Sequence, residues 1–200
     1  MPVYTYTTLD DPSANNNTQA FGINASGQIV GQYIDASNHT HGFLYSNETY
    51  TPLDDPSASA TGGTIALGIN DLGQIVGNYG DASGVHGFLY NNGSYTTLND
   101  PFATTNTTAF GINDAGQIVG FYSNGSGNHG FLYDPNSGIS PPYFNIADPG
   151  TQGTFARGIN AAEQIVGSYQ NASGVHGFLF RGLEYITLDD PNPPPGPRPR

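Results

Sequence analysis

Residues 68–79, GINDLGQIVGNY, are one of four copies of the same pattern. The copies start at Gly22, Gly68, Gly111 and Gly158, at spacings of 46, 43 and 47 residues. Each copy continues to an HGFL block followed by an aromatic residue, and closes with an aromatic-rich stretch that ends in Asp-Pro. A regular period of this length predicts a repeat protein in which each copy is one structural unit.

Each copy predicts four short strands, which in the first copy cover about residues 18–24, 28–34, 41–46 and 49–53. An Asn, two further residues and a Gly join the first two strands, a pattern typical of a tight hairpin with the Gly in the left-handed conformation. The fourth copy has Glu163 at this glycine position. A side chain there costs on the order of 1 kcal/mol if the geometry is kept.

The apolar residues of QIVG and GFLY are consecutive, so both faces of each strand must be covered. Radially packed blades provide such cover, and we therefore expect an all-β, four-bladed β-propeller-like fold with about four antiparallel strands per blade. A stacked array of sandwiches is the alternative. The predicted single repeat domain covers 1–191, with blades at about 18–56, 64–101, 107–149 and 154–191.

The strand that ends in Asp-Pro occurs five times, whereas the other three strands occur four times. We therefore expect a surplus N-terminal edge strand at 3–10, which extends the last blade or pairs with another subunit. Such head-to-tail pairing does not close automatically and can produce rings or filaments. The Pro-rich tail, 192–200, is a second candidate for self-association.

The chain is strongly acidic, with 16 acidic residues, 4 arginines, no lysine and a formal charge of -12. This charge disfavours nucleic acids and anionic lipid as partners, and leaves cations, neutral sugars and further copies of the chain. Cysteine is absent, which excludes disulfides and thiolate metal sites. No apolar run approaches the roughly 18 residues of a membrane helix, and the first residues lack a signal-peptide pattern.

One histidine recurs at the same place in every copy. Because we expect these residues on outer strands away from the axis, they cannot converge on one ion, and a structural hydrogen bond is the favoured role. His39 lies two residues before His41 and could form a chelating pair with it, although a structural role is again favoured. The recurring structural residues are His41, His86, His129, His176, Asn24, Asn70, Asn113 and Asn160.

The Asp-Pro pairs predict turns in which the carboxylate caps the following backbone. The functional alternative is a rim of carboxylates that binds Ca²⁺, although the chain lacks the dense oxygen-ligand loop of strong calcium sites. We expect no cofactor other than this Ca²⁺ alternative. The candidate metal ligands are Asp11, Asp55, Asp100, Asp148 and Asp190.

Catalysis usually needs an asymmetric cluster of polar residues, whereas almost all polar residues here recur by symmetry. We therefore expect no enzyme. Unrepeated charges occur in the fourth copy, where local ion pairing is expected for Arg157, Glu163, Arg181 and Glu184. A multivalent carbohydrate-binding protein is the main competing function, and its candidate ligand-binding residues are Tyr33, Tyr79, Tyr122 and Tyr169. The favoured role of these tyrosines is nevertheless in the blade core, because of their place beside QIVG.

The blocks GINxxGQIVGxY and HGFLY resemble the extracellular repeat family named for a His-Ala-Phe motif, with Gly in place of that Ala in all four copies. The resemblance spans nearly the whole chain. It implies an all-β, propeller-like repeat of exported or surface proteins, with no catalytic residues to transfer. From these observations we expect a non-enzymatic, extracellular structural or adhesive module that self-assembles through strand edges.

Overall fold

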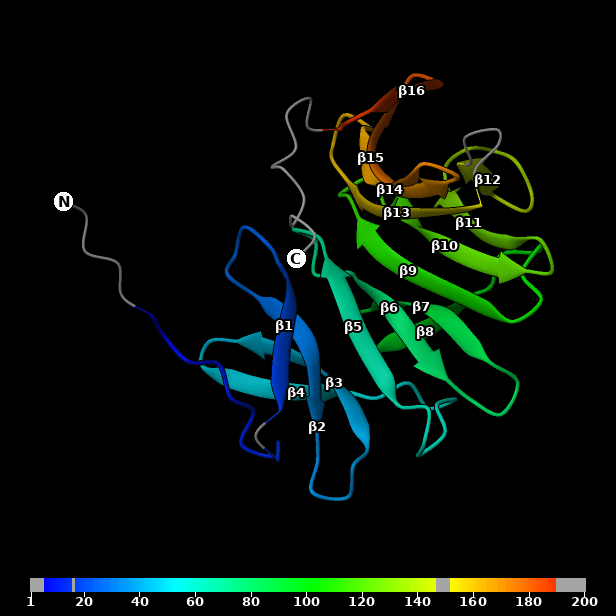
Figure 1. Ribbon diagram of the computed structural model, residues 1–200. Coiled ribbons are helices and arrows are strands. Elements are labelled where there is room, and N and C mark those ends of the chain that lie inside the picture. Colours follow the sequence, from blue (N-terminus) through cyan, green and yellow to red (C-terminus); the bar gives the residue numbers. More distant parts are fainter. Residues whose placement is uncertain (1–5, 16, 147–151, 190–200) are drawn as a thin grey trace, which may run out of the picture.

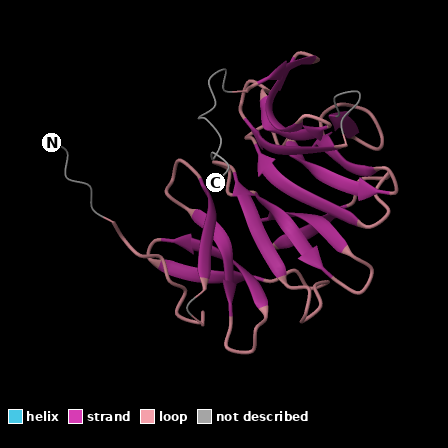
Figure 2. Ribbon diagram, in the orientation of Figure 1, coloured by secondary structure: helices cyan, strands magenta, loops and turns pink. Residues whose placement is uncertain are grey.

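A computed structural model describes residues 6–15, 17–146 and 152–189 of the chain. These residues form sixteen strands and no helix, and so contain no helix able to span a membrane (Figure 2). The first blade contains β1 (Thr18–Ile23), β2 (Ile29–Ile34), β3 (Thr40–Ser46) and β4 (Thr49–Leu53). The second contains β5 (Thr64–Ile69), β6 (Ile75–Gly80), β7 (Val85–Asn91) and β8 (Ser94–Leu98).

The last two blades repeat this order. The third contains β9 (Asn106–Ile112), β10 (Ile118–Asn124), β11 (Gly127–Tyr133) and β12 (Tyr143–Ile146). The fourth contains β13 (Gly153–Ile159), β14 (Ile165–Asn171), β15 (Gly174–Arg181) and β16 (Glu184–Thr187). Within each blade, consecutive strands pair antiparallel as a meander. Single parallel bridges link β7 to β9 and β11 to β13.

The tight turn between the first two strands has the geometry that its sequence predicts. Gly27, Gly73 and Gly116 have φ values of 74°, 76° and 78°. Glu163 occupies the same position in the fourth blade with a φ of 59°, so this blade keeps the turn in spite of the side chain.

The blades are arranged in succession around a common centre, with the first strand of each blade innermost (Figure 1). Strand β5 contacts both β1 and β9, and β9 contacts β13. The isoleucines at the ends of these four strands line one cavity of about 240 Å³: Ile23, Ile69, Ile112 and Ile159. The predicted all-β, propeller-like fold is therefore confirmed.

Three apolar cores lie between neighbouring blades. In the core between the second and third blades, Val76 and Leu98 of the second pack against Ala109, Ile112 and Ile118 of the third. We call the face of a blade that carries residues such as Val76 and Leu98 its rear face. The face that carries residues such as Ala109, Ile112 and Ile118 is the front face. Corresponding residues form the core between the first and second blades and the core between the third and fourth.

The ring is not closed between the fourth and first blades in the described part of the chain (Figure 1). The predicted surplus strand at 3–10 is seen only from Tyr6 onward, and residues 6–10 are not paired in a strand. Residues 1–5 and the tail at 192–200 lie outside the described residues, as do Asp148 and Asp190. The first and fourth blades therefore each keep one uncovered face.

Candidate functional site

The uncovered rear face of the fourth blade carries apolar side chains that are buried in every other blade. Val166 is 45% exposed, whereas its counterparts Val30, Val76 and Val119 are 0% exposed. An equivalent pair of leucines shows the same difference, since Leu188 of the fourth blade is 53% exposed and Leu98 of the second blade is 2% exposed. We call Val166, Leu188 and Gly158 the rear end face.

The uncovered front face of the first blade is the counterpart of this surface. Ile23 is 67% exposed, whereas Ile69 and Ile112 are 9% and 8% exposed. Ala20 is also exposed, although the corresponding Ala66 is fully buried. We call Ala20, Ile23 and Ile29 the front end face.

Recurring glycines set the close approach of neighbouring blades. A Cβ atom added to Gly68 would lie 2.7 Å from the carbonyl oxygen of Phe110 in the next blade. At Gly22 and Gly111 the same atom would lie 3.1 Å from a carbonyl oxygen of the next blade. At Gly158 it would meet only Val166 of its own blade, at 3.4 Å. The rear end face therefore keeps a glycine at the position where a following blade would approach.

A ladder of asparagines crosses the junctions near the axis. The Nδ2 atoms of Asn24, Asn70 and Asn113 each donate to the carbonyl oxygen of the next asparagine, at 3.0, 3.0 and 3.1 Å. The last of these acceptors belongs to Asn160, whose own Nδ2 donates to Gln164 at 2.8 Å and whose side chain is exposed. The ladder therefore ends with a donor on the rear end face and begins with the Asn24 carbonyl on the front end face.

The segment before the first blade has the same structure as the linkers that precede the other blades. The backbone N–H of Asp11 donates to Thr18 Oγ1 at 3.1 Å, as that of Asp55 does to Thr64 Oγ1 at 2.9 Å. The N–H of Asn15 donates to the carbonyl oxygen of Ile34 at 2.8 Å. The outer part of the first blade is therefore covered as in an internal blade, and its inner part is not.

The recurring histidines lie in separate blades, near the start of the third strand. In the second blade, His86 Nδ1 lies 3.0 Å from Asn99 Oδ1, and its Nε2 lies 2.9 Å from Ser83 Oγ. His129 and His176 make the corresponding serine contacts at 2.9 and 2.8 Å. These contacts join the strand to the loop before it, which is a structural role, and His41 has different neighbours that we consider below.

The candidate tyrosines do not form a sugar-stacking surface, which agrees with their favoured role in the blade core. Their side chains are buried, with exposures of 5%, 4%, 3% and 6% for Tyr33, Tyr79, Tyr122 and Tyr169. The ring of the recurring histidine covers each of them, at centroid distances of 4.9 to 5.2 Å. Burial raises the pKa of Tyr33 and Tyr122. These residues belong to the blade core, because their rings pack between strands rather than at the rim.

The described Asp-Pro carboxylates are buried and lie in different linkers. Asp11, Asp55 and Asp100 are 5%, 4% and 4% exposed. Each accepts a backbone N–H two residues later, at 2.8 to 2.9 Å. Burial raises the pKa of Asp100, an effect that the Phe102 N–H opposes. These contacts are those of turn caps, and the three carboxylates do not form a common rim.

Corresponding cavities lie on the outer side of the first two blade junctions. The first, of about 210 Å³, is lined by residues that include His41, Asp54, Asp55 and Thr64. The second, of about 240 Å³, is lined by the corresponding His86, Asn99, Asp100 and Thr107. Both combine hydrogen-bonding groups with small apolar side chains.

The unrepeated charges of the fourth blade make local contacts. The Arg181 Nε lies 3.8 Å from Glu184 Oε2, and Glu163 Oε1 accepts from Gln117 Nε2 at 3.1 Å. The Arg157 guanidinium lies 4.9 Å from the ring centroid of Phe110 in the third blade. Ion pairing was the expectation for this group. The structure shows an ion pair for Arg181 and Glu184, whereas Glu163 accepts a hydrogen bond from the third blade and Arg157 makes a cation–π contact across the same junction.

No family model and no curated protein matches the chain. Solved structures similar to it include a fucose-specific lectin from Aleuria aurantia, with 14% sequence identity and a TM-score of 0.48. A mutant of Aleuria aurantia lectin in complex with Fucalpha1-6GlcNAc has 16% identity and the same TM-score. Both alignments cover 86% of this chain, but only 61% and 62% of the lectin chains, so this chain spans less than two thirds of their length.

Proposed function

We propose that the protein is a non-enzymatic structural module that assembles head to tail, with the rear end face of one copy packed on the front end face of the next. The observation that carries this proposal is the exposure of Val166, whose three counterparts are buried, and of Ile23, whose counterparts Ile69 and Ile112 are buried at the first two internal junctions. Because the two faces differ, the contact is heterologous and leaves one free face at each end of a dimer. Longer assemblies are therefore expected. The resemblance of the repeats to extracellular repeats supports action outside the cell.

A second copy suits these faces because the internal junctions already contain the same pair of surfaces. The valine and leucine of a rear face pack on the alanine and isoleucines of a front face in the first two internal cores, and Ile146 takes the place of the leucine in the third. The Asn70 carbonyl accepts from both the Gly73 N–H and the Asn24 side chain. The Asn24 carbonyl accepts from Gly27 and can take the Asn160 side chain of a second copy in the same way.

The magnitudes predict weak and reversible association. Full burial of a Val, Leu or Ile side chain contributes about 1.5–3 kcal/mol, and the end-face residues are already partly covered. Association itself costs about 4–15 kcal/mol in lost translational and rotational freedom. The size of the assemblies should therefore depend on protein concentration.

Sedimentation velocity over a range of concentrations tests this function. We expect the substitution Val166→Asp to weaken association at least about tenfold, because it places a carboxylate in an apolar contact. Leu183→Asp is the matched control, since Leu183 lies in the turn between β15 and β16 of the same blade, is 91% exposed, and corresponds to Gly93 of the second blade, where an added Cβ atom would contact nothing. Circular dichroism of both variants checks that the fold is retained. A wild type that is monomeric at every concentration, or an equal effect of both variants, would contradict the proposal.

A second candidate function is multivalent carbohydrate binding in the cavities between blades. The observation that favours it is the correspondence between the two cavities, which place a histidine, an acidic residue and a threonine at equivalent positions. Calorimetric titration with a panel of monosaccharides tests this function. We expect Asn99→Arg, which fills the second cavity, to lower the number of binding sites, whereas the exposed Asn91→Arg should not. No binding by any sugar of the panel would contradict it.

A further inference from the structure

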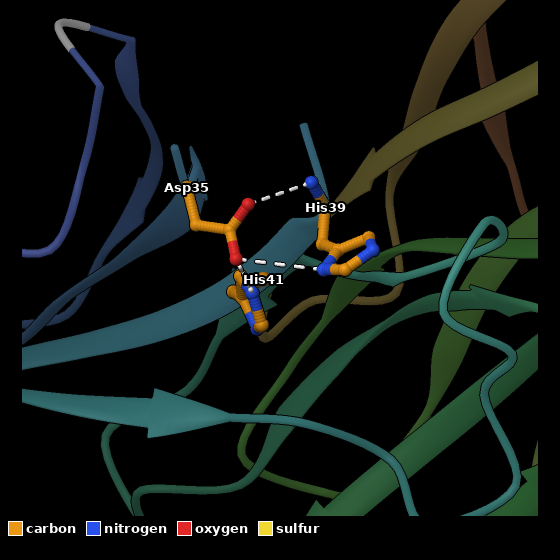
Figure 3. A group of neighbouring side chains, drawn as sticks. All are labelled: Asp35, His39 and His41. Carbon is orange, nitrogen blue, oxygen red and sulfur yellow. Dashed lines mark hydrogen bonds and ion pairs between the residues drawn. The ribbon is translucent and has the colours of Figure 1, made fainter. Parts of the chain in front are cut away.

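The loop between the second and third strands of the first blade differs from its three counterparts. Its recurring histidine follows the first loop residue by six positions, from Asp35 to His41, whereas the spacing is five in the pairs Asp81–His86, Asn124–His129 and Asn171–His176. In those three blades a serine hydroxyl lies within 2.9 Å of the histidine Nε2. The longer loop of the first blade instead brings a second histidine, His39, beside the carboxylate of Asp35 (Figure 3).

Three potential metal ligands converge in this loop. The Oδ2 atom of Asp35 lies 3.5 Å from His39 Nδ1 and 3.5 Å from His41 Nε2. All three ligand atoms lie within 4.8 Å of one another. Figure 3 shows the carboxylate pointing toward the two imidazole rings.

The hydrogen bonds around the cluster leave the right atoms free to bind a cation. Asp35 uses Oδ1 to accept the backbone N–H groups of Ser37 and His39, both at 2.8 Å, so Oδ2 remains available to the rings. These two N–H groups hold the carboxylate in the orientation that directs Oδ2 toward the rings.

Asp54 orients the imidazole of His41 from the opposite side. Its Oδ1 lies 2.9 Å from His41 Nδ1, so a neutral ring carries its proton on Nδ1 and directs the lone pair of Nε2 toward Asp35. A lone pair that faces a carboxylate oxygen is unfavourable unless a proton or a metal cation lies between them. A carboxylate on the remote nitrogen is also the usual outer-shell partner of a metal-bound histidine.

We propose that Asp35, His39 and His41 bind a divalent zinc-type ion, with Asp54 as the positioning residue of His41. A tetrahedral Zn²⁺ site has metal–ligand distances of about 2.0–2.1 Å, which place neighbouring ligand atoms roughly 3.4 Å apart. The two distances of 3.5 Å from Asp35 Oδ2 match this spacing. A small rotation of His39, whose side chain is 43% exposed, completes the third, and water takes the fourth position.

The ligand set discriminates between classes of metal. Two imidazole nitrogens and one carboxylate oxygen suit Zn²⁺, whereas Ca²⁺ and Mg²⁺ prefer sites made only of oxygen. His39 and His41 also line the cavity between the first and second blades, which gives an ion access from solvent. The formal charge of -12 favours cation binding in general, so the test must separate this site from diffuse attraction.

Isothermal titration of the metal-free, untagged full chain with ZnCl₂, in buffer that contains excess Mg²⁺, tests the proposal. We expect about one equivalent to bind the wild type and His39→Ala to weaken its binding at least about tenfold. His86→Ala is the matched control, because it removes the recurring histidine of the second blade and should leave this binding unchanged. We expect Asp54→Asn to lower affinity by about tenfold while the stoichiometry is retained. Co²⁺ bound to the wild type should show the strong visible absorption of a tetrahedral site.

A loop transplant tests whether the loop of the first blade is sufficient to create a zinc site in another blade. Replacement of residues 81–86 by the sequence of residues 35–41 should raise the stoichiometry from about one to about two equivalents. The Asn99→Asp substitution in the same variant supplies the counterpart of Asp54. Failure of the wild type to bind Zn²⁺ above the level of His39→Ala would overturn the proposal, and so would an equal loss in His86→Ala.

Discussion

The three internal junctions and the two end faces of this protein are built from the same residue types, but they differ in what covers them. Val76 and Leu98 are buried beneath the third blade, whereas Val166 and Leu188 occupy the same positions in the fourth blade and are about half exposed. The comparison teaches that the end faces have the composition of an internal junction but are not covered by another blade in the described part of the chain. Substitutions at internal junctions should therefore lower the free energy of unfolding strongly. Matched substitutions on the end faces should change it little when the chain is dilute.

The largest contrast is expected for leucine truncation. Leu98→Ala should lower the free energy of unfolding by about 3 kcal/mol, because it leaves a cavity in the core between the second and third blades. Leu188→Ala should lower it by less than about 1 kcal/mol in dilute solution, because the side chain is already 53% exposed. Urea denaturation of both variants checks this difference. Equal losses would mean that the fourth blade is covered in solution even when the chain is dilute.

An intermediate contrast is expected for the glycines that set the spacing of the blades. Gly68→Ala should cost about 2 kcal/mol, since the new Cβ would lie 2.7 Å from a backbone oxygen that cannot move freely. Gly158→Ala should leave the stability of the dilute chain nearly unchanged and should weaken association in sedimentation experiments. If Gly158→Ala destabilised the fold as much as Gly68→Ala, the two positions would not differ as described.

The smallest contrast is expected for the asparagine ladder. Asn70 and Asn160 make the same bonds within their own blades, but only Asn70 also donates to the next blade, at 3.0 Å from the Asn113 oxygen. Asn70→Ala should therefore be more destabilising than Asn160→Ala by about 1 kcal/mol, the net value of one hydrogen bond. Thermal unfolding of the pair, compared with the wild type, measures this difference. Equal melting temperatures would show that the bond between blades does not contribute.

The fold was largely predictable from the sequence because its signals are local and repeated. Consecutive apolar residues in QIVG required cover on both faces, and the observed strand β2, Ile29–Ile34, lies within the predicted range of 28–34. The turn sequence correctly predicted left-handed glycines, such as Gly73 with a φ of 76°, and the fourth blade keeps this geometry at Glu163 although its sequence departs from the pattern. Periodicity cannot show whether the last blade meets the first. That depends on the angle between successive blades.

The candidate sites were less predictable, because their chemistry depends on which face of a strand is covered. The tyrosines beside QIVG have a composition suited to sugars, but the recurring histidines cover their rings. The His39–His41 pair was visible in the sequence. Its acidic partners were not, because Asp35 is brought to the pair by the fold of the loop between β2 and β3, and Asp54 by the pairing of β3 with β4. The one-residue difference in loop length was the available signal.

The most direct test of head-to-tail assembly is sedimentation velocity of two variants, alone and mixed. Ile23→Asp disables the front end face and Val166→Asp the rear end face, so each variant retains one intact surface. Leu72→Asp serves as a control for Ile23→Asp, because both residues are 67% exposed. The account predicts that each variant alone is monomeric and that an equimolar mixture forms dimers that grow no further. A mixture that stays monomeric while the wild type assembles, or variants that assemble as well as the wild type, would contradict it.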